Sequence, residues 1–209
     1  LSASPGESVD GRTARAERTR LAVVDATLAL LGEGRLRPSA AEIAARAGVS
    51  PRSVFQHFED LDALHAAVAE RQLERIHASA RRISPEGPLA ERVAAFTEQR
   101  AHINEMITPV RRAGMLAEPF APEIALRLMR AREWGRRECA NVFAPELARL
   151  RAADARELLA ALTMASSWSA WESMRAHQGL TAAQARRVMS RTLTALLAAA
   201  TSARTGRSR

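Results

Sequence analysis

The chain has 209 residues and a formal net charge of +8, and this length allows a substantial core in one or two domains. It has no apolar run of the roughly 18 to 20 residues needed to span a bilayer, and the polar stretch from Leu1 to Arg20 lacks the apolar region of a secretory signal. The only cysteine, Cys139, has no partner for an internal disulfide and fits a reducing compartment, so we expect a cytoplasmic protein.

Every positively charged residue except histidine is arginine, which can hold a phosphate with two parallel hydrogen bonds. The same composition also fits the codon usage of a GC-rich genome. Residues 1–83 hold 12 Arg against 11 acids, a net charge of +1, whereas residues 84–209 hold 19 Arg against 12 acids, a net charge of +7. Net charge therefore supports a polyanionic partner only weakly.

The amino-terminal quarter predicts short helices with clear boundaries. Residues 1–11 lack periodicity and predict a disordered arm, followed by a basic helix over 12–31 that glycines end. Ser39 and Glu42 form a capping box for a helix through Ala47. Ser50 then caps a third helix, with Pro51 at its first position. A fourth helix is expected from 60 to 83.

The rest of the chain also predicts helices and no strand alternation, so we expect an all-α fold. Prolines mark the expected boundaries of helices over 89–107, 110–116 and 122–143. A long helix is expected over 154–179, and a capping box of Thr181 and Gln184 opens a last one to 203. A basic tail over 204–209 follows.

Residues 39–58 have the spacing of two short helices joined by a tight turn. Ala44 is small enough for a steep helix crossing, and Gly48, four positions later, accepts the positive φ of the turn. The expected inner apolar face consists of Ile43, Val49, Val54 and Phe58. The second helix then aims an outer face at a major groove, made of Pro51, Arg52, Ser53, Gln56 and His57. The alternative is a similar hairpin inside an ordinary helical bundle.

This segment resembles the amino-terminal domain of TetR-family transcriptional regulators. The resemblance covers residues 12–71 and is carried by Ile43-Ala44, Ala47-Gly48-Val49-Ser50, Phe55, His57-Phe58 and Leu64. It implies a homodimer that binds a palindromic operator and releases it when a small molecule enters the larger domain. We do not expect an enzyme, because the sequence has no convergent catalytic set. The domains implied are a helix-turn-helix DNA-binding domain over 12–60 and a helical ligand-binding and dimerisation domain over 61–203.

Carried over by position, the family's DNA contacts fall on Ser39, Ser50, Pro51, Arg52, Ser53, Phe55, Gln56 and His57. Arg52 and Gln56 are expected to read base edges, and the serines to bind phosphates. For His57, packing beneath the helix is an equal alternative to a phosphate contact. Phe55 replaces the family's usual phosphate-binding tyrosine, and Leu61 replaces a common lysine. Arg12 and Arg15 offer compensating contacts, although arginines there also suit a solvated face.

A set of methionine, aromatic and polar residues in the larger domain is expected to contribute to a pocket for a small, largely apolar ligand. The set is Phe96, His102, Met106, Arg112, Met115, Phe120, Trp134, Met164, Trp168 and Trp171. Each of its apolar members also suits a simple core. We expect no metal site and no cofactor other than an unknown small-molecule effector, because no ligand spacing is present.

The last two helices are expected to form the dimer interface, as half of a four-helix bundle. Apolar residues recur there at helical spacing: Leu158, Leu159, Leu162 and Ala165 in the first, and Val188, Thr192 and Leu196 with the flanking Leu193 and Leu197 in the second. Close helix approach is allowed by the small residues Ala160, Ala161, Ala165 and Ser169. The alternative is a helical pair that packs only within its own subunit. Together these features predict a ligand-responsive, DNA-binding transcriptional regulator, a homodimeric repressor on an inverted repeat. The rival is a helical interaction module that retains the hairpin without sequence-specific DNA binding.

Overall fold

The computed structural model describes residues 5–119 and 121–206, with side chains for 11–116, 118–119 and 121–200. The elements in these ranges are helices, without a strand, as expected for an all-α fold. They divide into two compact units. The first unit comprises residues up to 78 together with 109–116, and the second comprises 79–108 and the residues from 117 onward.

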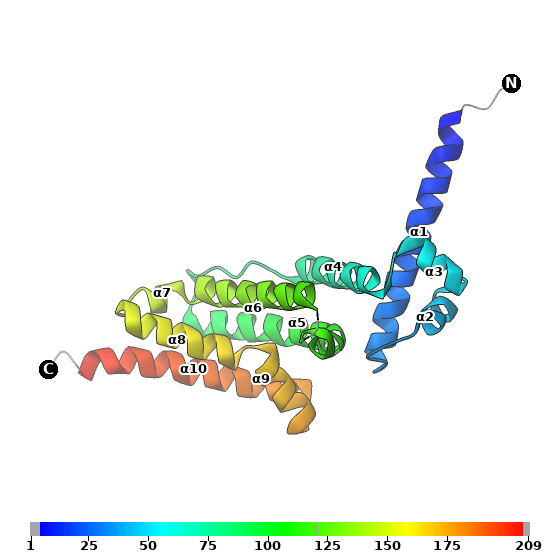
Figure 1. Cartoon of the computed structure of the whole chain (residues 1–209). Coiled ribbons are helices and arrows are strands. Elements are labelled where there is room, and N and C mark those ends of the chain that lie inside the picture. Colours follow the sequence, from blue (N-terminus) through cyan, green and yellow to red (C-terminus); the bar gives the residue numbers. More distant parts are fainter. Residues whose placement is uncertain (1–4, 120, 207–209) are drawn as a thin grey trace. The chain divides into compact units, whose positions relative to one another are not determined.

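The first unit is built from α1 (Pro5–Gly32), α2 (Ala40–Ala47), α3 (Pro51–His57) and α4 (Leu61–Ser79) (Figure 1). One apolar cluster joins these helices, and its fully buried members include Val23, Ile43, Val54 and Leu64. Since Leu64, Ala67 and Val68 of α4 belong to this cluster, the domain boundary expected at residue 60 lies too early in the chain.

The second unit contains residues 89–108 of α5 (Leu89–Ala117) and the helices that follow it. These are α6 (Pro122–Val142), α7 (Ala144–Leu147), α8 (Ala152–Ala165), α9 (Trp168–Glu172), the π-helical turn η1 (Ser173–His177) and α10 (Ala182–Gly206). Its core includes Phe96 and Phe143, whose rings meet edge to face at 5.3 Å. In Figure 1, α8 and α10 lie side by side, and they are in contact.

A buried ion pair fastens the start of α5 to α7. Arg92 and Glu146 are 2.6 Å apart, and only 6% and 10% of their side chains are exposed. Arg92 also donates to the carbonyl oxygens of Gly87 at 2.8 Å and Val142 at 2.7 Å. Burial raises the pKa of Glu146, but the hydrogen bonds and charge of Arg92 outweigh burial and lower it overall. The pair is therefore charged and well hydrogen-bonded, as a buried pair must be.

Several expected boundaries are corrected. Helix α1 begins at Pro5, so residues 5–11, expected to be disordered, are helical. Helix α4 ends at Ser79 rather than at residue 83. Beyond its end, the backbone N–H of Arg81 donates to the side chain of Gln99 instead of to a carbonyl of the helix. Helix α10 continues through Gly206 into the expected tail, and residues 1–4 and 207–209 lie outside the described residues.

The structure also differs from the expected helix boundaries at Pro109 and at the pair Ser166 and Ser167. Pro109 lies inside α5, although a proline there leaves one helical hydrogen bond unmade. The long helix expected over 154–179 is instead divided at Ser166 and Ser167. The Ser166 hydroxyl donates to the Leu162 carbonyl at 2.8 Å, and the Ser167 hydroxyl accepts from the Ala170 N–H at 3.1 Å. The Ser167 side chain here accepts from an N–H that would bond to a carbonyl in a continuous helix.

Candidate DNA-binding site

The start of α2 is fixed by the capping box expected from the sequence. The backbone N–H of Ser39 and its hydroxyl each donate to Glu42 Oε2 at 2.8 Å, and the Glu42 N–H donates back to Ser39 Oγ at 3.3 Å. These bonds to Ser39, with the neighbouring guanidinium of Arg35, lower the pKa of Glu42 to about 2. Glu42 is therefore ionised at neutral pH, and the cap persists over the physiological range.

The turn between α2 and α3 depends on one left-handed residue. Gly48 has φ +69° and ψ +32°, and the N–H of Val49 donates to the Ala44 carbonyl at 3.0 Å. A residue with a Cβ is strained in this conformation. Ser50 then caps α3 by accepting from the Ser53 N–H at 3.2 Å, with Pro51 next in sequence. The turn and cap together set the direction in which α3 leaves α2.

Helix α3 has a buried face and an exposed face. Val54 is fully buried, and Phe58, which caps the helix, is 4% exposed within the core of the first unit. The exposed face carries Pro51, Arg52, Phe55 and Gln56, whereas Ser53 and His57 are half-buried. The structure thus brings the side chains expected to read base edges onto one exposed surface.

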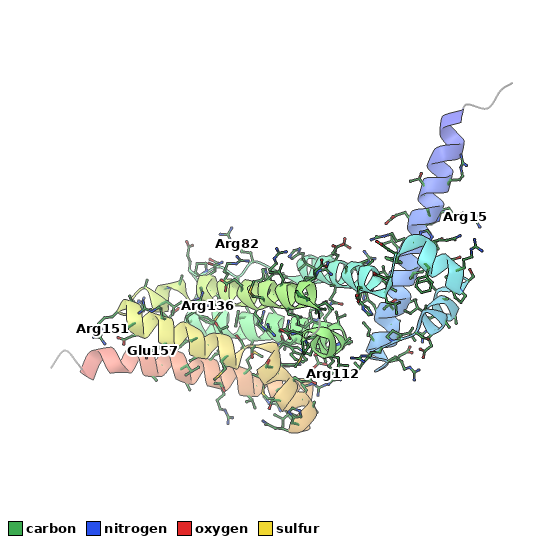
Figure 2. All side chains as sticks on the ribbon, viewed as in Figure 1. Arg15, Arg82, Arg112, Arg136, Arg151 and Glu157 are labelled. Atoms are coloured by element: carbon green, nitrogen blue, oxygen red, sulfur yellow. The ribbon has the colours of Figure 1, made fainter. Side chains whose placement is uncertain are left out.

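The remaining predicted contacts lie in different settings. Ser39 and Ser50 are exposed, but both hydroxyls already serve as helix caps, and Ser50 Oγ lies 3.0 Å from Ser53 Oγ. Arg12 and Arg15 lie on the exposed part of α1, where Figure 2 labels Arg15. A phosphate contact by either capping serine must therefore share its hydroxyl with the cap.

Two contacts that hold this site were not anticipated. The guanidinium of Arg20 lies over the ring of Phe58, 5.3 Å from its centroid, and covers the end of α3. Arg46 at the end of α2 pairs with Glu33 after α1 at 2.6 Å. Neither pair has a local spacing that marks it in the sequence, because each depends on how the helices cross.

The residues proposed to contribute to a ligand pocket come from both units and differ in exposure. Arg112 and Met115 belong to the first unit, while the other described members belong to the second. His102 is exposed, and Met164 is 68% exposed. Phe96 and Trp171 are fully buried in the core, and Trp168 is nearly so. Met106 and Trp134 are half-buried, and Phe120 lies outside the described residues.

A buried polar cluster in the second unit is a better candidate for a ligand contact. Arg100 and Asn104 of α5 are 8% and 0% exposed. Arg100 donates to Glu138 of α6 and to the Ser166 carbonyl through long hydrogen bonds of 3.3 Å each. Asn104 Nδ2 donates to the same carbonyl at 3.5 Å. Within the described part of the chain, Arg100 Nε and Asn104 Oδ1 have no hydrogen-bond partner.

The surroundings of this cluster increase the cost of those missing bonds. Burial lowers the pKa of Arg100, and the charge of Glu138 opposes the shift only in part. Trp134 lies 5.9 Å from the guanidinium, and a Cβ on Gly135 would come within 3.1 Å of it. A buried donor and a buried acceptor left unpaired each cost about 1–3 kcal/mol. The cluster is therefore a weak stabiliser, and it offers both a donor and an acceptor to a ligand.

The described ranges hold neither a metal-binding cluster nor a helix that could span a membrane. No group of three or more His, Cys, Asp or Glu side chains there is arranged to hold a metal ion. None of the helices described is long and apolar enough to cross a membrane. Cys139 is fully buried, and burial raises the pKa of its thiol to about 12, which suppresses thiolate chemistry.

The region that contains α2 and α3 is similar to known proteins. Residues 23–68 match the family model described as bacterial regulatory proteins, tetR family. No curated protein sequence matches the chain. A transcriptional regulator from Rhodococcus sp. Rha1 has a similar structure, with TM-score 0.65 and 17% identity over 88% of this chain and 96% of its own.

Two structures described as TetR-family transcriptional regulators are also similar. The one from Mesorhizobium loti MAFF303099 has TM-score 0.60 and 17% identity over 88% of this chain and 98% of its own. The one from Rhodococcus sp. has TM-score 0.62 and 16% identity over 86% and 98%. These likenesses show a shared fold. The family match over residues 23–68 includes α2 and α3, so this part of the chain is a DNA-binding domain of the TetR type, as found in transcriptional regulators.

Proposed function

We propose that the chain is a ligand-responsive repressor that binds an inverted-repeat operator as a homodimer. The observation that carries the proposal is the exposed face of α3, where Arg52 and Gln56 lie one helical turn apart while Val54 and Phe58 are buried. Two copies of α3 related by a twofold axis would enter successive major grooves, about 34 Å apart. An inverted repeat has the matching symmetry.

Arg52 is the proposed principal reader of the operator. Its side chain is exposed and has a guanidinium that can bond to O6 and N7 of guanine, the commonest specific contact in the major groove. Gln56, on the next turn of the same face, is suited to adenine. The rival function, a helical interaction module, is favoured by nothing on this face except the apolar Phe55.

Replacing Arg52 by Ala should weaken operator binding by about 1–3 kcal/mol for each half-site and remove discrimination at one base pair in each. A gel-shift titration against an inverted repeat selected by the protein from random-sequence DNA measures both effects. Arg136→Ala is the matched control, because it removes the same charge from an exposed site on α6. Equal affinity and equal preference in the Arg52 variant and the wild type would favour the interaction module.

The proposed dimer contact uses the exposed faces of α8 and α10. Leu158, Leu162, Leu193 and Leu197, expected at the interface, are buried within the subunit itself. The opposite faces carry small and apolar side chains that remain exposed. On α8 these are Ala160 and Met164, and on α10 they are Val188, Thr192, Ala195 and Ala199. Such stripes suit close packing of two helix pairs as a four-helix bundle.

A double substitution of Met164→Glu and Val188→Glu should convert the dimer to a monomer, because it places four carboxylates in the proposed bundle. Sedimentation velocity at micromolar concentration measures the change. Met129→Glu is the control, since Met129 is an exposed methionine of α6 outside this face. A double variant that sediments like the wild type would contradict the proposed interface.

The proposed effector is a small, mostly apolar molecule with one polar end that bonds to Arg100 and Asn104. The unpaired Nε–H of Arg100 offers a donor and the unpaired Oδ1 of Asn104 an acceptor. Because Glu138 already balances the charge of Arg100, an uncharged polar end such as a hydroxyl or an amide fits the cluster best. Effector binding would favour a spacing of the two α3 helices that does not match the grooves.

Asn104→Leu should raise the free energy of unfolding by about 1 kcal/mol, because it removes a buried acceptor that has no partner. Urea unfolding at neutral pH measures the effect, and operator affinity should not change. Asn141→Leu, at an exposed site on α6, should change stability by less than about 0.5 kcal/mol. A clear loss of stability in Asn104→Leu would show instead that the cluster is a structural network.

A further inference from the structure

Phe55 is an exposed aromatic residue on the helix proposed to read DNA. Its side chain is 53% exposed, whereas Phe58, three residues later, is buried in the core of the first unit. A lone exposed apolar side chain is ordinary on a protein surface, so its exposure alone says nothing about function. The position of Phe55 on α3 is what gives its exposure a meaning.

Phe55 lies on the same face as the two proposed readers. It follows Arg52 by three residues and directly precedes Gln56, and all three side chains are exposed. Residues three apart on a helix are neighbours, so the ring lies beside the side chain of Arg52. When Arg52 meets a base edge, water is displaced from the ring as well. The ring has no hydrogen-bonding group, so it cannot bond to a phosphate.

The base edges in the major groove offer one apolar group, the C5 methyl of thymine, and phenylalanine is among the side chains that pack on it. Three residues along a helix correspond to a rise of about 4.5 Å, slightly more than the base-pair step of about 3.4 Å. A thymine one or two steps from the guanine bound by Arg52 is therefore within reach of Phe55.

We infer that Phe55 determines specificity by packing its ring on the C5 methyl of a thymine in each half-site. The inference rests on the proposed operator binding and adds a base that the hydrogen-bonding residues do not read. It assigns to Phe55 a direct contact with a base edge in place of any contact with the DNA backbone.

The test replaces thymines by deoxyuridine, which differs only in lacking the C5 methyl. The probe is the duplex that the protein itself selects from random-sequence DNA, with each thymine replaced in turn. One replacement should weaken wild-type binding about fourfold for one half-site and about 16-fold for both, as expected for one methyl group. Phe55→Ala should bind the thymine and uracil duplexes equally, because the partner of the methyl is gone.

Arg52→Ala is the matched control, since it should bind more weakly yet keep its preference for thymine over uracil. Thermal unfolding by circular dichroism should show that Phe55→Ala is folded, because Phe55 lies outside the buried cluster. The inference is overturned if no single uracil lowers wild-type affinity, or if Phe55→Ala still prefers thymine; sequence-specific binding then stands. Failure to select any inverted repeat would instead overturn the proposed function, and with it this inference.

Discussion

Burial of Val54 and Phe58 is the constraint on which the proposed DNA-binding surface depends. Helix α3 has only seven residues, too few to be stable alone, so its packing and its Ser50 cap hold it in place. Once these two side chains are buried, the helical period leaves Arg52, Phe55 and Gln56 facing outward. The left-handed Gly48 and the capping box before α2 then set the direction of that surface. A substitution at any of these positions would therefore move the exposed face of α3 while leaving Arg52 and Gln56 themselves unchanged.

Two buried arginines of the second unit, Arg92 and Arg100, differ in how fully they are hydrogen-bonded. Arg92 has two carbonyl oxygens and a carboxylate as acceptors, so its burial is well compensated. Arg100 has longer bonds and one unpaired nitrogen, beside an asparagine whose oxygen is also unpaired. Natural proteins accept such a loss of stability mainly where function requires it. This contrast favours a structural role for the Arg92 pair and a ligand-binding role for the Arg100 cluster.

Local signals made the helix-turn-helix predictable. Each of these signals involves residues only three or four positions apart, and the structure contains each of them: the caps at Ser39 and Ser50, the turn at Gly48, and, later in the chain, the capping box at Thr181. The sequence patterns misled at Pro109, because a proline marks a helix boundary only as a tendency, and at Ser167, because a serine starts a new helix only where its side chain bonds to the backbone. The leucines of α8 and α10, expected at a dimer contact, show a different limit. Periodicity shows which face of a helix is apolar but not what covers it. The ring of Phe58 beneath Arg20 had no local signal at all.

The central claim is that α3 binds operator DNA through arginine and base contacts, and the salt dependence of binding tests it most directly. Affinity for a selected inverted repeat should be measured between about 50 and 200 mM salt, with a scrambled duplex beside it. Each phosphate that the protein neutralises releases counterions, so the logarithm of the affinity should fall linearly and steeply with the logarithm of the salt concentration. The inverted repeat should remain preferred throughout. Binding that does not change with salt, or that is equal for both duplexes, would contradict the account.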